Sequence, residues 1–262
     1  GACAGCAQPT YVKLLTQLFG EELMLSNASG CTSVWSATFP MNPFTTNHEG
    51  FGPTFAWSLF EDGAEYGYGQ RLTMKFQRMH VQSMIERGLD AGKATGELKD
   101  ALVQWSANFN NFYESKKATD RVRAALEVDT ESDAEFKAEI EDRSRLLAKK
   151  SLWVYAGDGW AYDIGYGGVD HVIASGDDMN ILVLDSEVYS NTGGQSSKAS
   201  PRSAITKFQA HGKNTAKKDL GLITMTYKHA YVASIAMGAK PAHAIKTLQE
   251  AEAYDGDRKS VV

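Results

Sequence analysis

The sequence predicts an α/β fold, with a mainly parallel sheet covered by helices on both faces and a helical insert at about residues 91–150. In the last third of the chain, apolar runs with the length of buried strands alternate with helical patterns, as in parallel sheets covered on both faces. Residues 91–150 are instead charged, rich in alanine and helical in periodicity.

The composition is typical of a globular protein. The chain has 262 residues, of which 43% are hydrophobic and 23% charged, enough for one large domain or two small ones. Its net charge of -5 argues against nucleic acid as the main partner. No apolar run approaches the ~20 residues of a membrane span. The chain starts "GACAGC", without Met or an apolar leader, so we expect no signal peptide and a processed chain or a piece of a longer one.

The first 90 residues predict two helices, a strand and a long loop. Residues 9–20 have helical apolar spacing, and Gly20 can end that helix. Residues 22–30 predict a short strand that runs into a polar loop. Residues 37–70, rich in Gly, Pro and aromatic residues, predict a structured loop, and residues 70–90 predict an amphipathic helix.

The insert is expected to contain helices at 96–108, 111–127 and 131–150, and to serve as a packing or subunit-contact arm. Strands and helices alternate after it. The elements expected there are, in order, a strand and turn at 151–159, a helix at 160–176, a strand and polar loop at 179–191, one or two strands within 220–238, and a helix at 240–256 stopped by Gly256.

The turn Gly157-Asp158-Gly159 follows a predicted buried strand, where open parallel sheets bind their ligands. The start of a helix offers free N–H groups to a phosphate, and glycine lets the backbone come close to it. An aspartate there would repel a phosphate unless a divalent cation lay between them, as Mg²⁺ does. A plain tight turn is the alternative interpretation.

The next strand supplies further oxygen donors. Its loop, "DSEVYSNTGGQ", contains Asp185, Ser186, Ser190, Asn191 and Thr192. One strand–helix–strand unit of about 30 residues separates the two loops, so both should reach the same edge of the sheet. Together they predict a diphosphate site bridged by a cation.

"GDGWAYDIGYGG" followed by "LDSEVYSNTGGQSSKAS" resembles the thiamine-diphosphate-binding C-terminal domain of the pyruvate:ferredoxin (flavodoxin) oxidoreductase family. The resemblance covers nearly the whole chain. It implies that residues 1–262 form a domain binding thiamine diphosphate and Mg²⁺, within a larger multidomain enzyme. It also implies that Asp158, Ser186 and the carbonyl of Val188 bind Mg²⁺, with Ser186 standing where the family usually has Thr.

The same resemblance assigns the remaining site residues. Asn191 would also lie near the reacting substrate, as a catalytic residue. Gln8 stands where the family usually has Glu. The cofactor-binding residues implied in this way are Gln8, Cys31, Gly157, Asp158, Gly159, Trp160, Ser186, Glu187, Val188, Tyr189, Ser190 and Asn191.

Cys3, Cys6 and Cys31 are the three cysteines, and their odd number gives no closed disulfide framework. The resemblance implies that they bind a [4Fe–4S] cluster close to the thiamine. Such clusters normally have four cysteine ligands. In the family the fourth follows a segment resembling "AEAYDG", so either this chain stops short of it or the site is incomplete. A zinc site completed by His48, or unligated thiols, are the alternatives.

The resemblance implies oxidative decarboxylation of pyruvate to acetyl-CoA, with electrons passed to ferredoxin or flavodoxin. Expected partners are pyruvate or another 2-oxo acid, coenzyme A, the electron carrier, the enzyme's other domains or subunits, and a second copy in a homodimer. The family's ring-activating Glu lies outside this region, so we expect only part of an active site here and no turnover by the chain alone. A 2-oxoglutarate or branched-chain 2-oxo acid enzyme, or a non-catalytic cofactor-binding fragment, are the alternatives.

Reduced thiols and an iron–sulfur cluster predict anaerobic metabolism in the cytoplasm or in a hydrogenosome-like organelle. The segment "HGKNTAKKD" (211–219) would either steer an acidic electron carrier or coenzyme A phosphates, or form a solvated charged face.

Overall fold

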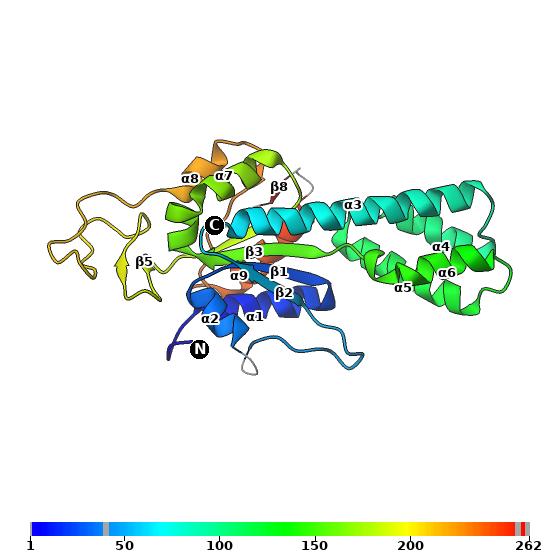
Figure 1. The fold of residues 1–262 in the computed structure, drawn as a ribbon, viewed down its shortest axis with the longest axis horizontal. Helices are drawn as coiled ribbons and strands as arrows, with labels where there is room; N and C mark the ends of the chain where they lie inside the picture. The colour runs from blue at the N-terminus through cyan, green and yellow to red at the C-terminus, as the bar shows by residue number, and fades with distance from the viewer. Residues whose placement is uncertain (1, 39–41, 255–257, 260–262) are drawn as a thin grey trace. The chain divides into compact units, whose positions relative to one another are not determined.

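The computed structural model describes residues 2–38, 42–254 and 258–259 (Figure 1). The chain divides into two compact units. Gly1–Arg71 together with Ser151–Val262 form one, which we call the sheet unit, and Leu72–Lys150 form the other, which we call the helical unit. In the described part of the chain, no helix combines the length and the apolar character that crossing a membrane requires.

Four parallel strands form the central sheet, in the order β2–β1–β3–β4. The strands are β1 (Leu23–Ala28), β2 (Thr54–Ser58), β3 (Ser151–Gly157) and β4 (Asn180–Leu184). β3 lies inside the sheet and is almost wholly buried, as its apolar sequence predicts. The α/β prediction with a parallel sheet is therefore confirmed.

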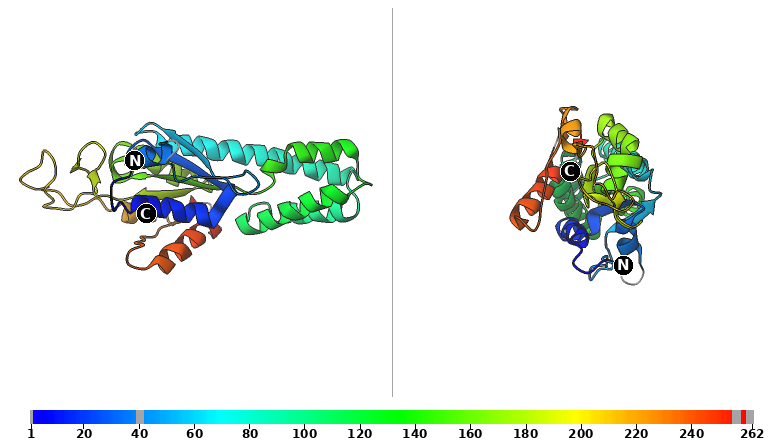
Figure 2. Two further views of the ribbon diagram at one scale, coloured as in Figure 1. Left: turned by 90° about the horizontal axis from the view of Figure 1, so that it is seen from below. Right: turned by 90° about the vertical axis from the view of Figure 1, so that its left-hand side faces the viewer.

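One face of the sheet is covered by α1 (Gln8–Phe19), α2 (Cys31–Ala37) and α9 (Pro241–Ala253) (Figure 2). Alternate residues of β3 point to this face. Phe19 of α1 stacks on Trp153, and Trp35 of α2 lies against Tyr155. α9 contacts α1, and its buried Glu252 accepts hydrogen bonds from Ser151 and Asn180, which fixes it to the starts of two strands.

The other face is covered by the first part of α3 (Gly63–Asp90) and by α7 (Tyr166–Ser175). Here the intervening residues of β3 enter a core with side chains from both helices. Its members include Leu152, Val154 and Ala156 of β3, Ala64 of α3, and Val169, Val172 and Ile173 of α7. Helices thus cover both faces, as the sequence predicts.

The prediction of a loop at residues 37–70 is wrong for the second half of that range, which forms β2 and the start of α3. The glycines that suggested a loop allow close packing instead. A Cβ on Gly63 would lie 2.5 Å from the Cβ of Ala28, and one on Gly67 would lie 2.3 Å from Cγ2 of Val154. The helix therefore approaches the sheet more closely than a side chain would permit.

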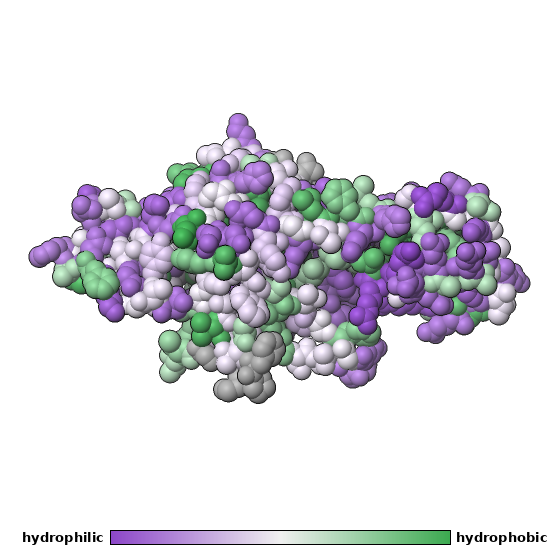
Figure 3. Space-filling view, viewed as in Figure 1, coloured by the Kyte–Doolittle hydropathy of each residue, from purple (hydrophilic) through white to green (hydrophobic). Residues whose placement is uncertain are grey.

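The helical unit contains the second part of α3, α4 (Gly96–Ala107), α5 (Phe112–Val128), α6 (Ala134–Asp142) and the short 3₁₀ turn η2 (Ser144–Leu146). The side chains of Asn111 and Asp133 cap α5 and α6 by accepting backbone N–H bonds. Polar side chains cover most of its visible surface (Figure 3). The first two helices expected in the insert are confirmed, whereas the third ends at Asp142, earlier than the expected 150.

The segment 220–238 differs from the expected strands. It forms the helix α8 (Leu220–Met225) and the two-residue strand β7 (Ala230–Tyr231), which pairs with β8 (Arg258–Lys259). The side chain of Asp219 accepts a hydrogen bond from the Leu222 N–H and caps α8. A short apolar run fits a strand or a helix equally well, and here the capping bond from Asp219 favours the helix. Gly256, expected to stop α9, lies outside the described residues.

The close approach of α3 to β3 gives a test. Gly67→Ala should lower the free energy of unfolding by about 1–3 kcal/mol, because its methyl group would clash with Val154. Gly69→Ala in the same helix is the control: its Cβ would meet open space, and the variant should be about 0.5–1 kcal/mol more stable. Chemical denaturation measures both, and equal effects of the two substitutions would contradict this packing.

Candidate functional site

The ends of β3 and β4 lie side by side, because the strands are parallel and Gly157 is paired with Leu184. Asp158 follows β3 and leads into a single π-helical turn, η3 (Gly159–Ile164). Asp185 and Ser186 follow β4. The two loops that the sequence singles out therefore meet at the carboxyl edge of the sheet.

Three predicted ligand oxygens are neighbours at this edge. The Ser186 hydroxyl lies 2.9 Å from Oδ1 of Asp158 and 3.2 Å from the carbonyl oxygen of Val188. Adjacent ligands of an octahedral Mg²⁺ with bonds of 2.0–2.1 Å are about 2.9 Å apart. This all-oxygen set therefore suits Mg²⁺ in chemistry, and the two distances from the Ser186 hydroxyl are compatible with that spacing, while the assignment of the ligands stays a prediction.

The loop after β4 folds back sharply to bring these oxygens together. Glu187 adopts a φ of 62°, a value that residues other than glycine seldom take. The β5 (Val188–Tyr189) and β6 (Gln195–Ser196) strands then form a small antiparallel hairpin. The Ser190 hydroxyl lies 2.6 Å from that of Ser186. Ser190 thus borders the same group of oxygens.

Asp158 is fully buried, and burial raises the pKa of its carboxyl group. Hydrogen bonds from Ser197 and Ser186 lower this pKa, and the nearby Asp185 raises it. Among the described residues, no cationic side chain contributes to the shift. A buried carboxylate with hydroxyl partners but no cationic partner is costly, and a bound divalent cation would supply the missing charge.

The two glycines of the Gly-Asp-Gly turn differ in how much space surrounds them. A Cβ on Gly159 would lie 2.5 Å from the ring of Tyr189, so this glycine makes room for a side chain of the hairpin. A Cβ on Gly157 would meet nothing closer than 4.0 Å. Trp160 is fully buried in the core of the sheet unit, and Tyr189 packs edge-on against Phe60.

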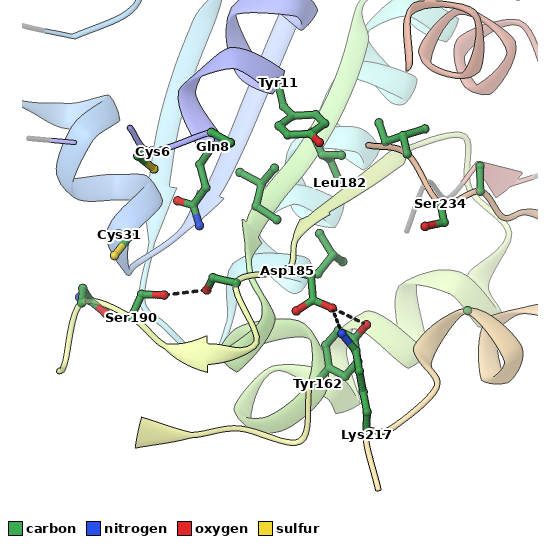
Figure 4. A pocket seen from close by; sticks show the side chains of 18 of the residues that line it. Cys6, Gln8, Tyr11, Cys31, Tyr162, Leu182, Asp185, Ser190, Lys217 and Ser234 are labelled. Atoms are coloured by element: carbon green, nitrogen blue, oxygen red, sulfur yellow. Dashed lines mark hydrogen bonds and ion pairs between the residues drawn. The ribbon is translucent and has the colours of Figure 1, made fainter. Parts of the chain in front are cut away.

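Two hollows adjoin the site. A small one of about 30 Å³ is bordered by the Gly-Asp-Gly turn, the loop after β4 and the start of α2. A larger one of about 1060 Å³ extends from the cysteines to α8 (Figure 4). The predicted site residues that line both are Gln8, Cys31, Ser186, Ser190 and Asn191.

Cys3, Cys6 and Cys31 are unpaired thiols that line the larger hollow. Burial raises the pKa of the Cys31 thiol, Cys3 and Cys6 raise it further, and a hydrogen bond with Ser190 lowers it. Within the described ranges, no three His, Cys, Asp or Glu residues are grouped so that they could hold one metal ion. His48, whose side chain is 90% exposed, pairs with Glu49. The zinc alternative is therefore not supported.

Three lysines of the basic segment 211–219 contact the site loops or the segments next to them. The buried Lys213 donates to the carbonyl oxygens of Lys198 and Ser200, and Lys218 donates to that of Tyr162. Lys217 pairs with Asp185 at 2.6 Å and with Glu187 at 3.1 Å. These lysines hold the site loops together, so the expectation of a merely solvated face is wrong for them.

Sequence reasoning missed three side chains at this edge: Ser197, Lys217 and Tyr162. Ser197 donates to Oδ2 of Asp158 at 2.6 Å, and Tyr162 donates to Asp185, which Lys217 also contacts (Figure 4). The serines in "QSSKAS" and the lysines in "TAKKD" were visible in the sequence. Nothing in their spacing showed that Ser197 contacts Asp158 or that Lys217 contacts Asp185.

Lys217 offers a test of this arrangement. Lys217→Met should lower the free energy of unfolding by about 0.5–1 kcal/mol, because the partly exposed Asp185 and Glu187 lose their shared cation. Lys198→Met is the control, since Lys198 pairs with Asp163 from a side chain that is 61% exposed, and it should cost below about 0.5 kcal/mol. Denaturant titration compares them, and a Lys217 variant as stable as its control would contradict the bridging role.

Comparisons with known proteins show which enzymes this chain resembles. Residues 140–262 match the family model described as "Thiamine pyrophosphate enzyme, C-terminal TPP binding domain". The chain is 48% identical over 260 residues to the pyruvate:ferredoxin oxidoreductase of Moorella thermoacetica. It is 47% identical over 256 residues to the pyruvate-flavodoxin oxidoreductase of Klebsiella pneumoniae. Each match covers 98% of this chain but 22% of the relative.

A solved structure shares the fold. It is described as "2-oxoglutarate:ferredoxin oxidoreductase from Magnetococcus marinus with 2-oxoglutarate, coenzyme A and succinyl-CoA bound", and it matches with a TM-score of 0.53 at 14% identity. The match covers 100% of this chain and 62% of that one. The chain is therefore homologous over nearly its whole length to a part of the pyruvate:ferredoxin and pyruvate-flavodoxin oxidoreductases, and its residues 140–262 match the C-terminal TPP-binding domain of thiamine pyrophosphate enzymes.

Proposed function

We propose that this chain supplies the Mg²⁺ and diphosphate site of a thiamine-diphosphate-dependent pyruvate:ferredoxin or pyruvate:flavodoxin oxidoreductase. The observation that carries the proposal is the meeting of Asp158, the Ser186 hydroxyl and the Val188 carbonyl at the carboxyl edge of the sheet. Homology to pyruvate enzymes at 47–48% identity supports pyruvate over other 2-oxo acids as the substrate.

In this proposal the cation lies between the Asp158 carboxylate and the diphosphate. The cradle would consist of residues 157–160 and 186–191, which border the smaller hollow in large part. The first N–H groups of η3 have no partner within that turn and can face phosphate oxygens. Positive charge from the cation would offset the repulsion between the phosphates and the buried carboxylate.

Thiamine diphosphate, when bound, supplies a nucleophilic carbon and an electron sink for the decarboxylation of a 2-oxo acid. The residues of this chain would fix its diphosphate end and keep water out. Asn191, which lines both hollows, is proposed to contact the reacting substrate. Gln8 and Cys31 border the same space and would lie against the cofactor.

We further propose that Cys3, Cys6 and Cys31 provide three ligands of a [4Fe–4S] cluster, with the fourth from outside the chain. Their place on the hollow that also reaches Ser190 and Asn191 supports this proposal, since a cluster there would border the thiamine site. A cubane cluster holds its thiolates farther apart than a single ion does, so the absence of a compact one-ion group among the described residues is compatible with it.

The chain spans 22% of the length of the Moorella thermoacetica relative, so a complete enzyme would need further domains or subunits. The other proposed partners are coenzyme A, ferredoxin or flavodoxin, and a second copy in a homodimer. The cytoplasm, or a hydrogenosome-like organelle, is the proposed location.

Asp158→Ala should abolish the Mg²⁺ dependence of thiamine diphosphate binding, because it removes the charged oxygen ligand. Calorimetric titration with thiamine diphosphate, with and without Mg²⁺, measures this. Asp170→Ala, which removes a carboxylate from the following helix α7 that accepts hydrogen bonds from Tyr166 and Tyr227, is the control and should keep the dependence. Unchanged Mg²⁺-dependent binding by the Asp158 variant would refute the ligand assignment.

The cluster is tested by iron and labile-sulfide analysis after anaerobic purification of the full-length enzyme that carries this chain. A Cys31→Ala variant should lose the iron attributable to this cluster, about four atoms per chain. A variant that retains its full iron content would argue against Cys31 as a ligand. The same analysis on Ser33→Ala, two residues along α2, controls for general disturbance of that helix.

A further inference from the structure

The carboxylate of Asp158 is held from two opposite sides. Ser186 donates to Oδ1 through both its hydroxyl and its backbone N–H, at 2.9 and 3.1 Å. The hydroxyl of Ser197 donates to Oδ2 at 2.6 Å, in a fully enclosed position. The two oxygens of this carboxylate therefore have different partners, and it is Oδ1 that lies beside the Ser186 hydroxyl, another predicted cation ligand.

Ser197 is oriented so that its proton points to Asp158. Its oxygen already accepts a hydrogen bond from the Ala199 N–H at 3.1 Å, so its single proton is available for the carboxylate. Its own N–H donates to the Ser200 hydroxyl at 3.0 Å, and that hydroxyl donates to the carbonyl of Glu187, in the loop after β4. Ser197 is thus tied to both strand ends.

The buried amino group of Lys213 fixes the segment around Ser197. Nζ of Lys213 donates to the carbonyl oxygens of Ser200 at 2.7 Å and of Lys198 at 3.2 Å. The N–H of Lys198 donates to Asp163 at 3.0 Å, which ties the segment to η3. A side chain locked in this way can hold its partner in one orientation.

We infer that Ser197 is a positioning residue of the proposed Mg²⁺ site, which holds Oδ2 of Asp158 away from the cation and so enforces binding through Oδ1 alone. This inference rests on the proposed function. A carboxylate that contributes one oxygen suits the small octahedral Mg²⁺, whereas Ca²⁺ readily takes both oxygens of a carboxylate. Ser197 would therefore favour Mg²⁺ over Ca²⁺ as well as strengthen its binding.

The test measures the affinity of the full-length enzyme for Mg²⁺ and for Ca²⁺, each by calorimetric titration at saturating thiamine diphosphate. Ser197→Ala should weaken Mg²⁺ binding about 10- to 100-fold, the usual effect of losing a partner of a metal ligand. Ca²⁺ binding should weaken clearly less, so the preference for Mg²⁺ falls. Ser197→Thr keeps the hydroxyl and should retain most of that preference.

Ser196→Ala is the matched control: it removes the same atom from the preceding residue, which makes no hydrogen bond to Asp158 among the described residues, and it should behave as wild type. An equal loss of Mg²⁺ and Ca²⁺ affinity in Ser197→Ala would show a merely structural role and overturn the inference, as would unchanged Mg²⁺ affinity. If the wild-type enzyme itself bound thiamine diphosphate without needing a cation, the proposed function would fail, and this inference with it.

Discussion

The site depends on one buried carboxylate placed where two parallel strands end. Asp158 lies wholly out of solvent, and its nearest partners are hydroxyl and N–H groups. Such a group is stable only when its charge is balanced or its proton is retained. The surrounding loops must therefore place hydrogen-bond donors, and the oxygen atoms of the other predicted cation ligands, close to the two carboxylate oxygens of Asp158.

The sheet brings the two loops together. Because β3 and β4 are parallel neighbours and their last residues, Gly157 and Leu184, are paired, the loops that follow them start side by side. The positive φ of Glu187 then turns the second loop back on itself, and Gly159 leaves room for the ring of Tyr189. An antiparallel pair would have sent the two chain ends to opposite edges.

The lysines of the segment 211–219 stabilise the outer side of the same edge. The buried amino group of Lys213 donates to backbone carbonyl oxygens, and Lys217 bridges the carboxylates of Asp185 and Glu187 in the loop after β4. Lys213 makes its contacts inside the protein, whereas Lys217 stays partly exposed on the larger hollow. Both lysines thereby support the loops of the site.

The fold class, the strands β1, β3 and β4, most of the helices and the resemblance to pyruvate:ferredoxin oxidoreductases could all be predicted from the sequence. These follow from signals that are local or contained in a continuous motif, such as apolar periodicity and the Gly-Asp-Gly turn. Sequence reasoning misjudged residues 54–70 and 220–238, because a glycine that allows close packing resembles a glycine that ends a helix, and a short apolar run fits either kind of element. The contact of Ser197 with Asp158, 39 positions earlier, became visible in the folded chain alone, because residues that far apart leave no spacing to detect. The same holds for Lys213, whose buried amino group binds the carbonyl oxygens of Lys198 and Ser200, since nothing in the sequence marks this lysine as buried.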